Sequence, residues 1–238
     1  MNIRWMGMSL LLALGASCST TYQARHAQTS GFLGDYSQLR KGRGQEPLLI
    51  YRDPAADPRA YDRILIDPIT GYMGAGSRLS KLAKPDRQAL LDYFHATLRE
   101  QLGQDYALVD RPGPGVLRLR IALTDARGTK PVLDTLSTVV PVGLAISALE
   151  RAALGKTLTT GSVRIEAEAL DGETGMRLAA LVDERVGAKI TGRFDKWSKW
   201  QDARDAFDYW AARLRATLAT RRTPKRAPAP QPANPDRS

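Results

Sequence analysis

Residues 161–187 constrain the fold most strongly. Apolar and charged side chains first alternate, the chain then reads Asp-Gly-Glu-Thr-Gly at 171–175, and a second apolar run follows. Alternation with a period of two around a glycine-rich turn is typical of an antiparallel hairpin with one buried face. Glu166 and Glu168 fall on the same face of the first strand, and we interpret them as its solvated side.

Four further segments are predicted to be strands. Short apolar runs bounded by proline or glycine occupy residues 48–51, 63–67 and 106–110, and bounded runs of this kind are typical of strands. Residues 116–123 alternate apolar side chains with arginines, which indicates a strand with one wet face. The chain therefore contains enough strands for a sheet of several members.

Two segments have the spacing of amphipathic helices. In residues 86–103 the apolar side chains recur at intervals of three and four, Pro85 suits the first helical position, and Gly103 ends the pattern. Residues 199–220 show the same spacing, with acidic side chains near the start and arginines toward the end, as the helix dipole favours. A third, buried helix is expected at about 142–154.

These elements predict an α+β fold of two layers. We expect a two-layer sandwich, in which a mixed, mostly antiparallel sheet carries helices 86–103 and 199–220 on one face. One domain over residues 31–220 accounts for the folded part, and it is long enough to bury a core. Cys18 is the only cysteine, so the fold has no internal disulfide.

Residues 1–17 are predicted to be a signal peptide. Arg4 precedes an apolar run that is shorter than the roughly 20 residues of a membrane-spanning helix. Small residues stand directly before Cys18, and Gly15-Ala16-Ser17-Cys18 resembles the bacterial lipobox. We therefore expect acylation of Cys18, for example with palmitate, and a lipid bilayer as partner. The alternative is ordinary cleavage after Ser17, which would release a soluble periplasmic protein.

The segments beside the domain are polar or basic. Residues 18–30 are predicted to be a tether, and residues 221–238 a disordered basic tail rich in proline and alanine. Ser19 follows the cysteine, which by resemblance to the sorting rule of enterobacterial lipoproteins favours the outer membrane, with the domain facing the periplasm. The formal net charge is +10, but export argues against a nucleic-acid partner and favours anionic lipids or cell-wall polymers.

Few residues point to chemistry. Asp67 and Asp110 each end a predicted strand, and if these strands are parallel, both lie at one sheet edge, where α/β clefts form. Strand-end aspartates are also typical turn formers, so we retain the pair as tentative ligand-edge candidates. His26 and His95 have no evident partner, and the Gly-Lys-Thr string at 155–157 lacks the upstream glycine of a phosphate loop. No catalytic residue, metal site or cofactor is predicted.

Residues 139–149 are almost wholly apolar. Pro141 and the charged and polar neighbours of this run argue against a membrane span. We expect burial in the core, with a partner or oligomer surface as the alternative. Trp197 and Trp200 are likewise expected to pack in the core, with contact to lipid headgroups or glycan as the alternative.

Five separated strings are similar to a known family. They are SGFLGDYS at 30–37, RLRIALTDA at 118–126, VPVG at 140–143, EAEALDGETGMRLAALVDERVG at 166–187 and AFDYWA at 206–211. Together they resemble bacterial lipoproteins that carry domain of unknown function 3313, over most of the mature chain. The resemblance implies lipid attachment at Cys18, and it supplies no activity, cofactor or active site.

We therefore expect an exported, lipid-anchored envelope protein with a non-catalytic binding or assembly role. An envelope hydrolase that uses Asp67 and Asp110 is one alternative. A second alternative is an oligomeric or membrane-interacting component of an envelope complex that uses residues 139–149. The ligand, any envelope protein partner and the oligomeric state are left open.

Overall fold

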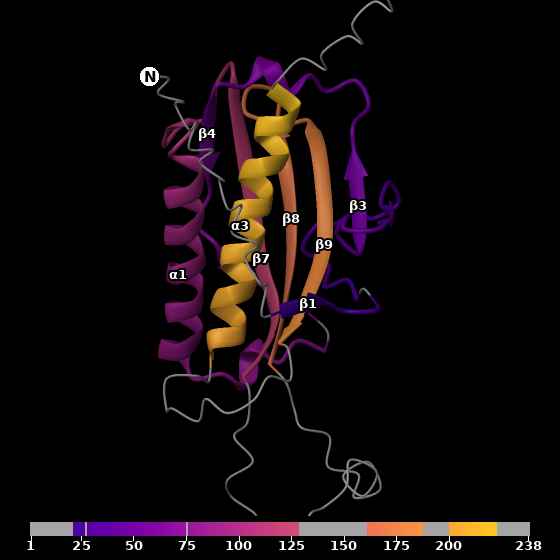
Figure 1. Ribbon diagram of the computed structural model, residues 1–238, viewed down its shortest axis with the longest axis vertical. Helices are drawn as coiled ribbons and strands as arrows, with labels where there is room; N and C mark the ends of the chain where they lie inside the picture. The colour runs from indigo at the N-terminus through magenta and orange to yellow at the C-terminus, as the bar shows by residue number, and fades with distance from the viewer. Residues whose placement is uncertain (1–20, 27, 75, 129–160, 188–199, 223–238) are drawn as a thin grey trace, which may run out of the picture.

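The computed structural model of the chain describes residues 21–26, 28–74, 76–128, 161–187 and 200–222. These residues form one sheet with two long helices, α1 (Lys84–Leu102) and α3 (Gln201–Arg222), side by side on the same face (Figure 1). This arrangement confirms the predicted α+β sandwich with helices on one face. The predicted signal peptide, Cys18, Trp197, the helix at 142–154, the apolar segment 139–149 and the tail from residue 223 lie outside the described residues.

The sheet is mixed and mostly antiparallel. Its strands are β1 (Thr21–Gln23), β2 (Arg40–Lys41), β3 (Leu49–Arg52), β4 (Arg63–Ile66), β5 (Thr70–Gly71), β6 (Ala107–Leu108), β7 (Val116–Arg127), β8 (Ser162–Asp171) and β9 (Arg177–Gly187). They are ordered β2-β3-β9-β8-β7-β4-β6, with β1 also paired to β9 and β5 to β7. Strands β4, β5 and β6 make the parallel pairings, and the other pairings are antiparallel.

The predicted hairpin forms the centre of the sheet. β8 and β9 pair in antiparallel register, with Glu168 opposite Ala180. The side chain of Asp171 holds the turn, because its Oδ1 accepts hydrogen bonds from the backbone N–H groups of Glu173 and Thr174 at 3.0 and 2.7 Å. Gly175 has φ of 74°, a left-handed conformation that glycine adopts without strain. The Asp-Gly-Glu-Thr-Gly string thus sets the register of the two strands.

Part of the expected tether belongs to the fold. Thr21 pairs with Gly187 and Gln23 with Arg185, so residues 21–23 form an additional antiparallel strand beside β9. Thr21 is buried, and the Arg185 guanidinium donates hydrogen bonds to its backbone and side-chain oxygens. Its polar composition gave no signal of a strand, because the segment is held by backbone pairing and by hydrogen bonds of the Thr21 and Gln23 side chains.

The main core lies between the sheet and the two helices. α1 begins with Pro85 in its first turn and buries one side that includes Phe94, and α3 buries Phe207 and Trp210. The rings of Phe94 and Phe207 stack with centroids 4.5 Å apart. Trp200 packs half-buried against this cluster, in agreement with its expected core position. The two predicted helical stripes therefore face each other over the strands.

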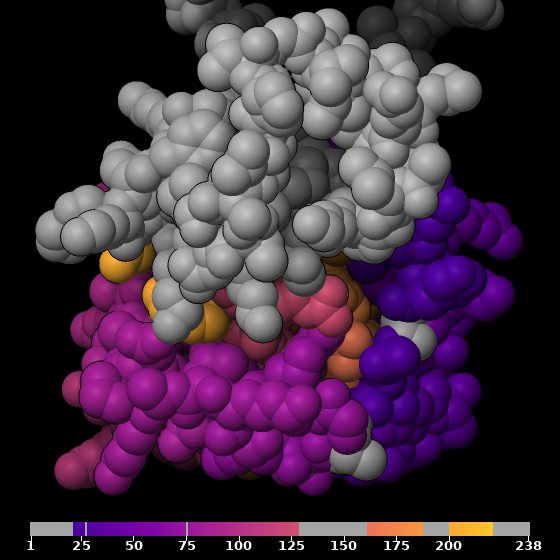
Figure 2. Space-filling view, turned by 90° about the horizontal axis from the view of Figure 1, so that it is seen from below, coloured from indigo at the N-terminus to yellow at the C-terminus, as the bar shows by residue number. Residues whose placement is uncertain are grey.

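The opposite face of the sheet is covered by the N-terminal part of the chain, which we call the strap (residues 28–39). Leu33 of the strap packs on Ala180 and Val182, whose side chains lie on the face away from the helices. Figure 2 views the end of the molecule where β9 ends. It shows N-terminal residues in indigo on one side of the strand ends and the region around α1 in magenta on the other. The sheet is thus sandwiched over part of its width.

Candidate functional site

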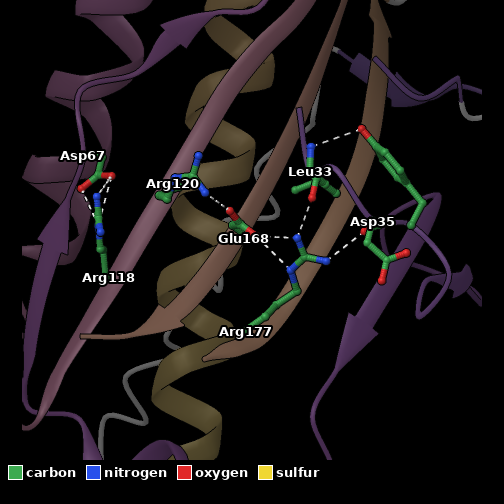
Figure 3. Close-up of polar contacts among 8 residues, drawn as sticks. Leu33, Asp35, Asp67, Arg118, Arg120, Glu168 and Arg177 are labelled. Carbon is green, nitrogen blue, oxygen red and sulfur yellow. Dashed lines mark hydrogen bonds and ion pairs between the residues drawn. The ribbon is translucent and has the colours of Figure 1, made fainter. Parts of the chain in front are cut away.

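The two strand-end aspartates lie at one edge of the sheet. β4 and β6 are parallel neighbours, so Asp67 and Asp110 follow strands that end on the same side, as the sequence predicts. The carboxylate of Asp67 is held by Arg118, whose Nε and Nη2 donate to it at 3.0 and 2.8 Å (Figure 3). This hydrogen bonding raises the pKa of the Arg118 guanidinium. Asp110 is exposed. The ion pair gives Asp67 a structural partner, and a ligand-edge role for the two aspartates stays a prediction.

The two glutamates of β8 are buried, and their expected place on a solvated face is wrong. Glu166 is 0% exposed and Glu168 is 4% exposed. Glu166 accepts hydrogen bonds from the backbone N–H of Ser30 and from the hydroxyl of Tyr36, each at 2.5 Å. Burial, together with this bond to Glu166, raises the pKa of the Tyr36 phenol. The charged side chains that alternate along β8 therefore lie on the sheet face that the strap buries, and they are not exposed to solvent.

Glu168 connects three strands and the strap. It lies opposite Arg120 on β7 and forms an ion pair with it, and Arg177 on β9 donates to its other oxygen at 2.8 Å (Figure 3). Arg177 also donates to the backbone oxygens of Leu33 and Asp35 at 2.7 and 2.9 Å. A buried carboxylate with two arginine partners is a stable arrangement only when its remaining lone pairs are also satisfied. Here the network fixes the strap to the sheet.

Further ion pairs extend this charged layer. Arg78 pairs with Asp125 of β7, and Arg164 of β8 donates to Glu184 of β9 at 2.8 Å. Because Asp125 and Glu184 each have an arginine partner, these ion pairs hold neighbouring elements together. The sequence did contain a signal for these ion pairs, namely the opposite charges of β7 and β8. Which charges pair depends on the register of the two strands, and local patterns do not fix that register.

The helix face contains an apolar cavity, which we call the hollow. It has a volume of about 220 Å³ and lies between the second half of α3 and strands β3, β9, β8 and β7. Its floor and roof are formed by apolar side chains, among them Ile50, Leu119, Ile121, Ala167, Ala169, Ala179, Leu181, Trp210, Leu214 and Leu218. Several of these, including the three alanines, are half-exposed. The hollow is therefore reachable from outside.

Three small residues explain why the hollow exists. Ala169 and Ala179 are direct cross-strand partners, and Ala167 lies two positions along the same face of β8. α3 crosses this area with Trp210, Leu214 and Leu218 at intervals of four. Methyl groups on the sheet do not reach the helix side chains, so a space remains where larger residues would fill a core.

Hydrogen bonds fix the two ends of the hollow. Asp183, 3% exposed, accepts from the indole Nε1 of Trp210 at 2.8 Å and from the Gln23 side chain at 2.7 Å. At the other end the Tyr61 hydroxyl donates to Asp171 at 2.8 Å. Burial, followed by this bond, raises the pKa of Tyr61 to about 12. Both aromatic side chains are thus held in place around an apolar space.

The rim of the hollow is polar. Glu46, on the loop between β2 and β3, accepts from Arg40 at 2.8 Å and from Arg52 at 2.7 Å. The hydrogen bonds from these two arginines lower the pKa of Glu46 to about 2. Arg213 of α3 donates to the backbone oxygen of Gln45 at 3.3 Å and so joins the helix to this loop. The hollow was not predicted from the sequence, because alanines in a strand give no signal of a cavity.

The interior and the rim of the hollow differ in polarity. The hollow combines an apolar interior with a few polar groups at its rim, which is typical of small-molecule binding sites. Over the described ranges, no three histidine, cysteine, aspartate or glutamate side chains gather as metal ligands. None of the helices in the described part is long and apolar enough to cross a bilayer.

Comparison with known proteins assigns the chain to a family. Residues 28–214 match the family described as a protein of unknown function, DUF3313. The chain belongs to this family of bacterial lipoproteins. A relative in Escherichia coli K12, the uncharacterized lipoprotein YdcL, is 30% identical over 182 residues, which are 76% of this chain and 80% of YdcL. The match begins within the strap and ends in α3, so the DUF3313 region includes both faces of the sheet.

Solved structures from other bacteria show a more remote similarity. The PelC dodecamer of Paraburkholderia phytofirmans aligns with a TM-score of 0.37 and 14% identity, over 71% of this chain and 94% of that chain. Protein XCC0632 of Xanthomonas campestris aligns with a TM-score of 0.39 and 14% identity, over 71% and 90%. A putative lipoprotein of Caulobacter crescentus CB15 aligns with a TM-score of 0.31 and 12% identity, over 69% and 91%.

Proposed function

We propose that this DUF3313 lipoprotein is anchored in the cell envelope through Cys18 and binds the alkyl chain of a lipid in the hollow, without catalysis. The observation that supports this function is the apolar space of about 220 Å³ between α3 and the alanines of β8 and β9. An apolar cavity of about 150 Å³ is enough to bind a benzene-sized group. The hollow is larger, and its half-exposed lining admits a chain that enters from the rim.

The short segment between Cys18 and the first strand determines which end of the protein would face the membrane. Cys18 stands three residues before Thr21, and three extended residues span about 10 Å. Thr21 pairs with Gly187, at the end of β9. An acyl anchor on Cys18 would hold this end of the sheet against the bilayer. The outer membrane, with the domain facing the periplasm, is the location that Ser19 favours.

The hollow lies away from the anchored end. Leu181, which lines it, is six residues before Gly187 on β9, and six strand residues span about 20 Å. A ligand in the hollow is therefore not a lipid that remains inserted beneath the protein. We propose instead a lipid that has left its bilayer and whose chain is shielded from water by α3.

Titration calorimetry with an alkyl series tests the binding function. The full chain with Cys18→Ser, which carries no lipid and is purified without detergent, is titrated with primary alcohols of increasing length. Each buried CH₂ contributes about 0.8 kcal/mol, or roughly a fourfold gain in affinity. We expect this increment for each added carbon until the chain outgrows the hollow, after which the affinity levels off.

A matched pair of substitutions locates the binding. Ala169→Leu places a larger side chain in the hollow, whereas Ala212→Leu makes the same change on the exposed side of α3. We expect Ala169→Leu to abolish alcohol binding and Ala212→Leu to leave it unchanged. No binding by the parent protein, or equal binding by both variants, would refute the proposal.

Fractionation tests the anchor separately. Cells that express the parent chain or Cys18→Ala are labelled with radioactive palmitate, and their membranes are separated by density. We expect label in the parent protein, located in the outer-membrane fraction, and loss of label in the variant. Unlabelled parent protein in the soluble periplasm would instead support cleavage after Ser17.

A further inference from the structure

Several basic side chains lie at or near the rim of the hollow. Exposed Arg40 and Lys41 form β2, and exposed Arg43 follows on the loop between β2 and β3, which lines the opening through residues 45–47. Arg52 and Arg213 line the opening as well. The acidic side chains among the lining residues at the rim are Glu46 and Asp53, and Glu46 is already bonded to Arg40 and Arg52. Glu46 thus pairs with Arg40 and Arg52, and no carboxylate in the described part of the chain forms an ion pair with Lys41, Arg43 or Arg213.

Arg213 is the cation best placed for a ligand. It is exposed and lines the opening, and both Leu214, the next residue, and Thr217, one helical turn further on, line the hollow. Its one described hydrogen bond goes to the backbone oxygen of Gln45, and no carboxylate in the described part of the chain pairs with it. A guanidinium has five N–H donors. Most of its donors therefore face solvent at the mouth of an apolar space.

We infer that the hollow selects an anionic amphiphile with one alkyl chain, held by its chain in the hollow and by its carboxylate or phosphate at Arg213. This inference rests on the proposed function, because it assigns the headgroup of the same ligand. An anion at the rim receives charge-assisted hydrogen bonds from Arg213, and the field of Lys41 and Arg43 adds to its attraction. A cationic headgroup at the same position is repelled by these side chains.

Three ten-carbon compounds with the same chain and different headgroups provide the test. Decanoate, decanol and decyltrimethylammonium are titrated calorimetrically into the full chain with Cys18→Ser, each below the concentration at which it forms micelles. We expect decanoate to bind most tightly and the ammonium compound least tightly. We also expect the affinity for decanoate, and not for decanol, to fall as salt shortens the screening length from about 30 Å at 0.01 M to about 8 Å at 0.15 M.

A second matched pair identifies the residue. Arg213→Gln removes the cation at the rim, and Arg204→Gln removes one from the side of α3 that faces α1, where Arg204 lies over the ring of Tyr93. We expect Arg213→Gln to weaken decanoate binding roughly threefold to tenfold and to leave decanol binding unchanged. Arg204→Gln should change neither.

The outcomes separate the two proposals. If none of the three compounds binds, both the alkyl-chain function and the headgroup assignment are wrong. If all three bind with equal affinity, or if the ammonium compound binds best, the headgroup assignment is wrong and the alkyl-chain function stands. Decanoate selectivity that persists in Arg213→Gln would also overturn the assignment of this residue.

Discussion

The two faces of the sheet differ in the side chains that they bury, which include several charged groups on one face and are mainly apolar on the other. On the strap face, the buried Glu166 and Glu168 each have two bonded partners, on the strap for Glu166 and on β7 and β9 for Glu168. On the helix face, apolar side chains surround a cavity of about 220 Å³. A buried carboxylate tolerates little loss of its partners, whereas an apolar face can retain a void, at a cost that grows with the volume of the void. The strap face therefore depends on matched polar partners, whereas the helix face, which also contains the main core, has room for a ligand.

The largest stability effect is expected in the core between the helices. Phe207→Ala removes a fully buried ring that stacks on Phe94, and truncations of this kind cost about 3–5 kcal/mol. The free energy of unfolding in urea measures the loss. Met176→Ala, at a side chain that is 55% exposed, should cost less than about 0.5 kcal/mol. Equal losses would show that the two helices do not form the main core.

A slightly smaller loss is expected on the strap face. Glu166→Ala leaves the Ser30 N–H and the Tyr36 hydroxyl without their acceptor, which costs about 2–4 kcal/mol. In this variant, the rate of amide hydrogen exchange should also increase more in the strap than in α1. Tyr36→Phe removes one of the two donors to Glu166 and also the acceptor of the Gly31 N–H, so it should cost about 1.5–3 kcal/mol. Unchanged exchange in the strap of Glu166→Ala would contradict its role as the attachment point.

Acid should weaken the hairpin turn by a smaller amount. Backbone hydrogen bonds from Thr174, followed by the Tyr61 hydroxyl, lower the pKa of Asp171 from 3.8 to about 2 in the folded state. The resulting stabilisation is complete above pH 3.8 and is lost as the pH falls toward 2, because the unfolded state takes up the proton first. We expect the free energy of unfolding of Asp171→Asn to lack this pH-dependent stabilisation, which is about 1 kcal/mol. Urea titrations between pH 3.8 and pH 2 measure it. If the stability of the variant depended on pH in the same way as that of the parent protein, Asp171 would not be the source of the effect.

The smallest effect is expected at the edge ion pair. The side chains of Arg118 and Asp67 are 38% and 21% exposed, and ion pairs near the surface contribute at most about 1 kcal/mol. Asp67→Asn should therefore lower the free energy of unfolding by less than this value. Glu168→Gln, which changes a carboxylate that is 4% exposed, should cost more. The opposite order would contradict the comparison of exposed and buried charges.

The sequence predicted the elements that have strong local signals. Both helices, the hairpin of β8 and β9, and the two-layer architecture are confirmed, because helical spacing and strand alternation are local properties. The helix ends differ by about two residues: the predicted 86–103 is Lys84–Leu102 and the predicted 199–220 is Gln201–Arg222. Strands β1, β2 and β5, each two or three residues long, were not predicted, because such short segments have no periodicity.

The candidate site could not be predicted in the same way. The partners of Glu166 come from residues more than 100 positions away in the chain, so alternation alone led to the wrong prediction of a solvated side chain. The hollow depends on alanines of two strands meeting beneath α3. Such a coincidence follows from register and packing, and neither is encoded in a short sequence window.

Anomalous diffraction from a bound bromoalkyl chain tests the binding function most directly. Crystals of the Cys18→Ser chain are grown with decanoate that carries bromine on its last carbon, and the bromine is located from its anomalous signal. We expect the bromine inside the hollow, near Ala169 and Leu214, with the carboxylate at Arg213. A bromine outside this space, or a hollow that remains empty at a saturating concentration of the compound, would contradict the assignment of the helix face as the ligand site.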